Sequence, residues 1–153
     1  MTVSQSILNA LLAATIELSG LPGIDVTELP VVVWASEAEL AALACPDQPD
    51  GCRSMAALFD TERYRILLRT SLDLGVPLDS SFLVHELVHV LQFKRFGHAR
   101  FMRCEDLLSS EREAYDVQNS YLRRQGIFWR EGEMLRYTRC PPEEDNDHPG
   151  AVK

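Results

Sequence analysis

The chain has 153 residues, of which 46% are hydrophobic and 25% are charged, a composition that favours one compact globular domain and excludes disorder as the overall state. Its formal net charge of -8 argues against a nucleic-acid partner, because binding to a phosphate backbone requires clustered lysine and arginine. No segment approaches the ~20 consecutive apolar residues that a transmembrane helix needs, so we expect no membrane span.

The N-terminal third predicts a helix, a strand and a second, short helix. Apolar residues recur at helical spacing over residues 4–19. Residues 31–34 are β-branched or aromatic, which predicts a strand. Ser36, with Glu39 three residues later, has the pattern of a capping box and predicts a helix over residues 37–44.

Two further strand candidates, residues 55–60 and 63–69, flank a polar turn and are consistent with a hairpin. The segment Tyr64–Arg69 mixes apolar and polar residues and would carry one polar face. With residues 31–34, these segments predict a small three-stranded sheet.

Two long helices complete the predicted elements. The first covers residues 82–96, with N-caps supplied by residues 79–81, and ends at Gly97. It is apolar nearly all round, which is typical of a helix buried in the interior. The second covers residues 104–125, or begins a few residues later at a serine cap. We therefore predict a domain over residues 1–140.

Beyond Cys140 the sequence is acidic and has no apolar anchor, so residues 141–153 are predicted to be a flexible tail. Of the three connectivities open to the four cysteines, we favour Cys45–Cys52 with Cys104–Cys140, because the first pair brackets a turn-rich segment whose ends can meet. Disulfides predict a periplasmic or secreted protein. Residues 1–20 lack the basic start of a signal peptide, so a signal peptide is expected to be missing from this sequence. Free buried thiols in a cytoplasmic protein are the alternative.

The buried helix contains the string His85-Glu86-Leu87-Val88-His89, an HExxH element. Positions i and i+4 lie on one helical face, so both imidazoles can reach a single Zn²⁺ while Glu86 faces the same cleft. Three such polar groups on an apolar helix are costly without a metal. The alternative is a buried polar cluster that only ties helices together.

A catalytic zinc site normally has three protein ligands, so a third ligand is needed. His98 follows the helix end, and the extended HExxHxxGxxH pattern is absent because Gln92 replaces its glycine and Arg95 its third histidine. The second long helix offers Glu111 and Glu113. At 100° per residue, Glu111 lies on the apolar stripe of that helix and Glu113 on the side expected to meet water. Glu111 is therefore the preferred third ligand.

The string Glu111-Arg112-Glu113-Ala114-Tyr115 resembles the ExxAD signature of the CAAX-prenyl endopeptidases and the ExxxD of thermolysin, both of the gluzincin group of zinc metallopeptidases. The resemblance covers residues 80–120. It implies that Glu111 ligates zinc and that Tyr115 stands where those families have an aspartate that orients a ligand histidine. That role then falls to the Tyr115 hydroxyl or to Asp116, or the support of the ligand histidines is weaker. Gln118, on the same stripe as Glu111, is expected to serve helix packing or ligand support.

The resemblance implies a zinc metalloendopeptidase with a peptide or protein substrate and Glu86 as general base toward a metal-activated water. Four groups are candidate oxyanion donors: Tyr115, Tyr121, Tyr137 and His98. Tyr64–Arg69 is the candidate edge strand for aligning a substrate. The oligomeric state is not readable from the sequence.

Two other functions are compatible with the motif. The segment Asp50-Gly51-Cys52-Arg53-Ser54 loosely resembles a motif of peptide deformylases, in which Cys52 would be the third ligand. A zinc-binding domain without activity, which binds a protein partner, is the main alternative. Our preferred fold is α+β: a zincin-like single domain whose small sheet packs against the HExxH helix and the second ligand-bearing helix.

Overall fold

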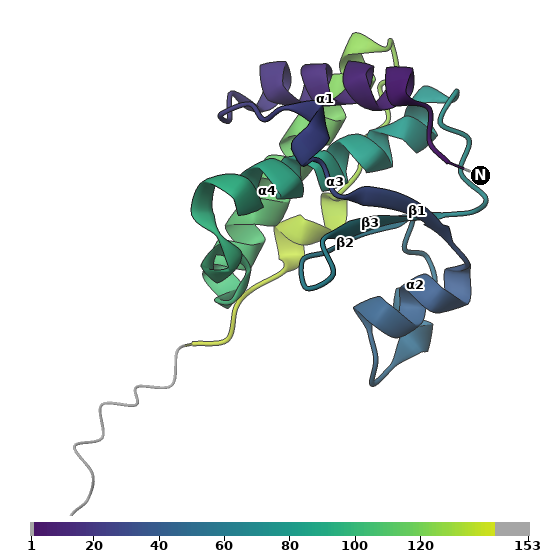
Figure 1. Cartoon of the computed structure of the whole chain (residues 1–153). Coiled ribbons are helices and arrows are strands. Elements are labelled where there is room, and N and C mark those ends of the chain that lie inside the picture. Colours follow the sequence, from purple (N-terminus) through teal and green to yellow (C-terminus); the bar gives the residue numbers. More distant parts are fainter. Residues whose placement is uncertain (1, 143–153) are drawn as a thin grey trace, which may run out of the picture.

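The computed structural model describes residues 2–142, which form one small α+β domain with a three-stranded sheet and four α-helices (Figure 1). The predicted acidic tail lies, from residue 143 onward, outside the described residues. Among the residues that are described, no helix combines the length and apolar character needed to cross a membrane.

The sheet has the order β1-β3-β2, with β1 (Val31–Ala35) parallel and β2 (Ala57–Asp60) antiparallel to the central strand β3 (Arg65–Arg69). The three middle residues of β3 are buried on both faces of the sheet, as expected of a central strand. The segment Tyr64–Arg69, the candidate edge strand, is therefore central in the sheet and does not supply that edge. The edge strand that faces α3 is β2.

The helices cover the two faces of the sheet unequally. The helices α1 (Gln5–Ser19), α3 (Pro77–Phe96) and α4 (Cys104–Arg124) share the main core with one face. The short helix α2 (Glu37–Ala44) packs on the other face through Leu40 (Figure 1). This places α3 at the centre of the molecule, between β2 and α4.

Most predicted boundaries agree with the structure within one to three residues, and α2 has its capping box at Ser36. The exception is α3, which begins at Pro77, about one turn before the predicted start. Proline is favoured at the first helical position because the amide proton it lacks would have no partner there. Residues 79–81 therefore lie inside the helix, and the predicted N-caps were wrong. The helix α4 runs unbroken from Cys104.

Both predicted disulfides are present. Cys45 pairs with Cys52 beside α2, and Cys104 at the start of α4 pairs with Cys140. The second bond closes a loop that contains α4 and residues 127–140. We name residues 127–140 the strap. Paired cysteines are typical of proteins from oxidising compartments.

Candidate metal centre

The centre of the site is the HExxH element on α3. His85, Glu86 and His89 are 7%, 7% and 6% exposed, so all three are polar groups in the interior. The i, i+4 spacing puts the histidine rings on one face with centroids 4.8 Å apart, and their Nε2 atoms lie 3.1 Å from each other.

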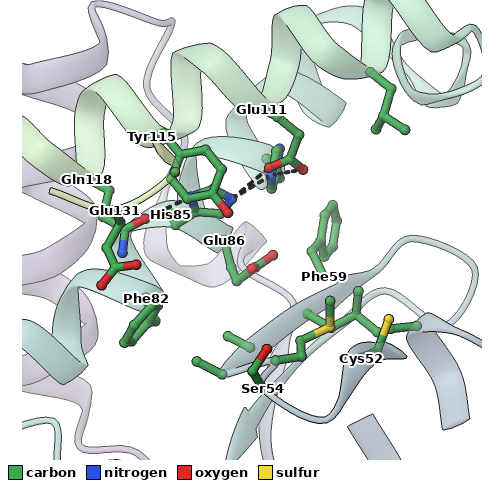
Figure 2. A pocket seen from close by; sticks show the side chains of 18 of the residues that line it. Cys52, Ser54, Phe59, Phe82, His85, Glu86, Glu111, Tyr115, Gln118 and Glu131 are labelled. Atoms are coloured by element: carbon green, nitrogen blue, oxygen red, sulfur yellow. Dashed lines mark hydrogen bonds and ion pairs between the residues drawn. The ribbon is translucent and has the colours of Figure 1, made fainter. Parts of the chain in front are cut away.

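The third residue of the cluster is Glu111, one residue before an exposed arginine on α4 but on the stripe that faces α3. Its two carboxylate oxygens lie 3.2 Å from His85 Nε2 and 3.0 Å from His89 Nε2. The ligand atoms of the three residues are all within 4.8 Å of one another, a spacing at which they can hold a metal ion (Figure 2). Helical phase therefore placed Glu111 correctly in the cluster.

Two buried glutamines hold the other side of the histidine rings. Gln118 Oε1 lies 3.0 Å from His85 Nδ1, and Gln92 Oε1 lies 2.8 Å from His89 Nδ1. Both amides are fixed in turn, because Gln118 Nε2 donates to Ser81 Oγ and Gln92 Nε2 donates to the carbonyl of Ser110. Since Ser81 Oγ donates its own proton to a backbone carbonyl, it must accept the bond from Gln118.

This arrangement sets the tautomer of both histidines. A glutamine oxygen can only accept, so each Nδ1 must carry a proton and each Nε2 presents a lone pair in the neutral ring. Two such lone pairs and the Glu111 carboxylate then converge on one point. Acceptors that face one another repel unless a cation or a proton lies between them. The donor set of two imidazoles and one carboxylate is one that suits zinc.

The pKa values of His89 and Glu111 are shifted by the same close approach of acceptor atoms. Burial alone would lower the pKa of His89, but the hydrogen bond to Glu111 and nearby carboxylates outweigh it and raise the pKa to about 9. Burial alone would raise the pKa of Glu111, but its close contacts with His85 and His89 hold that pKa well below its usual range. Without a metal, a proton on His89 offsets the negative charge.

Glu86 does not belong to the cluster of ligand atoms. Its carboxylate lies between the histidines and the edge strand (Figure 2). Burial, the largest cause, raises the pKa of Glu86, while His85, His89 and the backbone amide of Phe59 oppose the shift. A buried carboxylate with a raised pKa on the lining of a cleft is suited to accept and return a proton.

Tyr115 packs edge-on against His85, with ring centroids 4.4 Å apart. Burial is the main reason that the pKa of Tyr115 rises to about 12, so its hydroxyl stays protonated and can donate. Neither this hydroxyl nor Asp116, which is exposed, orients a ligand histidine: Gln118 occupies that position. The expectation of Tyr115 or Asp116 in the orienting role was wrong. Gln118 lies one turn beyond Ala114 on the same stripe as Glu111, and its contact with His85 agrees with the expected role in packing or ligand support.

The other candidate residues differ in whether they line the cleft. Glu113, the lesser candidate for third ligand, instead accepts a bond of 2.8 Å from Gln92 Nε2 and so supports His89 indirectly. Tyr121 bonds to Ser80 inside the helix pair and Tyr137 is exposed, and neither lines the cleft. His98 does line it, outside the ligand cluster.

The cleft in front of the cluster has a volume of about 1090 Å³. Its lining includes Cys52, whose bond to Cys45 excludes it as a thiolate ligand and contradicts the deformylase-like alternative. The cleft runs along β2 from the strap to the aromatic ring of Phe101. The cluster of His85, His89 and Glu111 lies within it, so a bound metal could meet a substrate.

A protein family described as a domain of unknown function, DUF6647, matches residues 8–149 of the chain. No curated protein and no solved structure matches it. The family match covers the sheet, α3 and α4, but assigns no activity. Function therefore has to be argued from the site.

Proposed function

The chain belongs to the DUF6647 family of domains of unknown function, and from the geometry of its cleft we propose that it is a zinc-dependent metallopeptidase with a zincin-like fold. His85, His89 and Glu111 bind one zinc ion, and Glu86 is the general base. The observation that carries the proposal is the convergence of two histidine Nε2 atoms and one carboxylate beside a separate buried carboxylate.

The ligand count favours a catalytic over a purely structural zinc site. Structural zinc sites are usually closed by four protein ligands, whereas catalytic sites have three and leave one position open. The cluster has three ligand residues among residues 2–142, and it borders the cleft. The alternative, a zinc-binding domain without activity, would need a fourth ligand or a Glu86 turned away from the cleft.

Bound zinc would act as a Lewis acid that activates water and polarises the substrate carbonyl. Glu86 would accept the proton from the attacking water and pass it to the leaving amine. Tyr115, protonated and in contact with His85, would donate a hydrogen bond to the developing oxyanion. His98, on the cleft lining, is the second candidate for that bond.

The free edge of β2 supports a peptide as substrate. Arg69 N donates to Ala56 O, and the alternation of an antiparallel pair then turns the amide and carbonyl groups of Ala57 and Phe59 away from β3. These residues line the cleft beside Glu86. The amide of Phe59 already donates to Glu86, so an extended peptide would pair as an added strand with Ala57 and the Phe59 carbonyl, which would bring its carbonyls past the metal cluster.

The test combines metal content and hydrolysis. Protein purified with zinc present should contain one equivalent of zinc and cleave unstructured peptides. Glu86→Gln should retain zinc and lose activity by about 100- to 10,000-fold. Glu111→Ala should weaken zinc binding by about 100-fold or more, the share of one ligand in a typical site.

Glu105→Gln, an exposed carboxylate in the first turn of α4, is the control and should change neither quantity. Wild-type protein without zinc after metal-replete purification would refute the proposal. Zinc binding without hydrolysis of any peptide would favour the non-catalytic alternative. We also propose that the protein acts outside the cytoplasm, in the periplasm or as a secreted protein, because both cysteine pairs are bonded.

A further inference from the structure

The strap contributes two carboxylates to the lining of the cleft, Glu131 and Glu133, and only Glu133 is paired with an arginine in the described part of the chain. Glu131 lines the cleft, and Figure 2 shows its carboxylate beside Gln118 and Phe82, on the opposite side of Tyr115 from Glu111 in that view. Its negative charge is close enough to contribute to the raised pKa of Tyr115, whose main cause is burial. Glu131 therefore lines the same cleft as the metal cluster but does not belong to the cluster.

The position of Glu131 is fixed by its backbone. Asn119, buried on α4, donates to the Glu131 carbonyl at 3.0 Å and accepts from the Glu131 amide at 2.8 Å. The next residue, Gly132, has φ +80° and lies flat against the Tyr115 ring, where a Cβ would be 2.6 and 2.7 Å from Cδ1 and Cδ2. These contacts hold the strap at Glu131 although no residue of the strap is buried.

Among the residues that the structure describes, no cationic side chain pairs with the Glu131 carboxylate. Arg130, the one lysine or arginine of the described lining, pairs with Glu133 at 3.0 Å. Zinc would offset the charges of Glu86 and Glu111. Among residues 2–142, the contact to the Glu131 carboxylate is the indole N–H of Trp129 at 2.8 Å, a neutral donor.

A carboxylate beside an aromatic ring is a combination that binds cations well. A lysine, arginine or terminal ammonium group can form a charge-assisted hydrogen bond with the carboxylate and lie over the face of the aromatic ring. Phe82 supplies that ring, because it lines the same end of the cleft next to Glu131 (Figure 2).

We propose that Glu131 is a specificity-determining residue, which together with Phe82 selects a peptide that carries a positively charged group at the strap end of the cleft. This inference rests on the proposed function, since it names the substrate class of that site. The charged group is either a lysine or arginine side chain or the free N-terminal ammonium of the peptide. An uncharged or acidic group at this position is disfavoured.

The test measures binding in zinc-loaded Glu86→Gln protein, so that the result does not depend on catalysis. The probes are short peptides with a C-terminal fluorophore, acetylated at the N-terminus, with lysine or its uncharged isostere norleucine at each position in turn. A second arm compares a norleucine peptide with and without the acetyl group. Fluorescence anisotropy gives the dissociation constants.

We expect one lysine position, or the free terminus, to bind about tenfold or more tightly than its uncharged counterpart, the usual strength of a hydrogen bond to a charged group. Adding Glu131→Gln should remove that preference. Adding Glu105→Gln, the control used above, should keep it because Glu105 is exposed on α4 and does not line the cleft.

Equal binding of charged and uncharged peptides, or no peptide binding, would overturn the inference, as would a preference that survives Glu131→Gln. The outcome for the proposed function is separate. A charge preference that depends on Glu131, found in a wild-type protein that hydrolyses none of the peptides, would support Glu131 as a recognition residue and reject peptidase activity.

Discussion

The α3–α4 pair and the strap line the same cleft, but they hold their functional groups by different means. On the helices, His85 and His89 are fixed by side chains that are 0% exposed, Gln118 and Gln92, and each of these is fixed in turn. On the strap no residue is buried, and Glu131 depends on Asn119, on Gly132 against Tyr115 and on the disulfide to Cys104.

This difference suggests a division of roles within the cleft. Metal ligands must be held rigidly, which buried networks on helices achieve. Loop segments held by few contacts open at lower free energy and tolerate changes of sequence, so they can adapt recognition without disturbing the chemistry. The variants below test whether the two regions are as independent as their contacts indicate.

The largest expected effect is on the strap. Replacing Cys104 and Cys140 by serine removes a link with a sequence separation of 36 residues. Loop-closure entropy then predicts a loss of about 4 kcal/mol in the free energy of unfolding. Urea denaturation measures this loss. Zinc affinity of the folded protein should stay nearly unchanged, because all three ligands lie on α3 and α4.

The matched control is the double serine variant at Cys45 and Cys52, whose sequence separation is 7 residues. Its expected loss is about 2 kcal/mol because the loop is shorter. If the Cys104 and Cys140 variant loses zinc as well as stability, the strap and the helices are not independent.

The next effect concerns the helices. Gln118→Leu and Gln92→Leu each leave a buried histidine Nδ1–H without an acceptor, so the ring is no longer held toward the cluster. Loss of such a supporting partner typically weakens metal affinity by about 10- to 100-fold. Competition with a chelator measures the affinity.

Gln125→Leu, at the exposed end of α4, is the control and should bind zinc like the wild type. Unchanged zinc affinity in both buried variants would show that the histidines need no such support. The structural basis for the metal proposal would then be much weaker.

The glutamines also show what the sequence could and could not predict. The HExxH element and the helical phase of Glu111 depend on local periodicity, and both are visible without a structure. Helical phase places Gln118 on the stripe of Glu111, but its contact with His85 depends on how α3 and α4 pack, which periodicity does not specify. Gln92 lies three residues after His89 on the same helix, so only its contacts to α4 depend on that packing. The glutamine at position 92 was noted only as a departure from another motif, although its amide joins His89 to Glu113.

Strand order and the strap were missed for the same physical reason. Short strands do not reveal which of them is central until their long-range pairing is known, so β2 was not recognised as the edge strand facing the site. Glu131 is positioned by Asn119, 12 residues away, through bonds to its backbone. Backbone contacts of this kind leave no pattern in the identity of Glu131 itself.

A smaller effect tests the contact between the two regions. Gly132→Ala puts a side chain on a residue with φ +80° and pushes it into the Tyr115 ring. The backbone conformation alone costs about 1–2 kcal/mol for a residue other than glycine. Gly126→Ala is a close control, since it has φ +77° and nothing within 4 Å of its Cβ. A greater loss of stability for Gly132→Ala isolates the Tyr115 contact, and equal losses would show that the contact contributes little.

The last prediction concerns protons at the cluster. In the metal-free protein, Glu111 raises the pKa of His89 to about 9, although burial alone would lower it. The charged His89 therefore contributes stability that is fully present below the ordinary value of 6.5 and is lost as the pH rises through about 9. Within that window, zinc must displace this proton, so its apparent affinity should rise about tenfold per pH unit, or about 1.4 kcal/mol. Chelator competition at several pH values, with Gln118→Leu compared at each, measures the slope. An affinity that does not change with pH would mean that His89 is already neutral, and that the Glu111 contact does not hold a proton when the metal is absent.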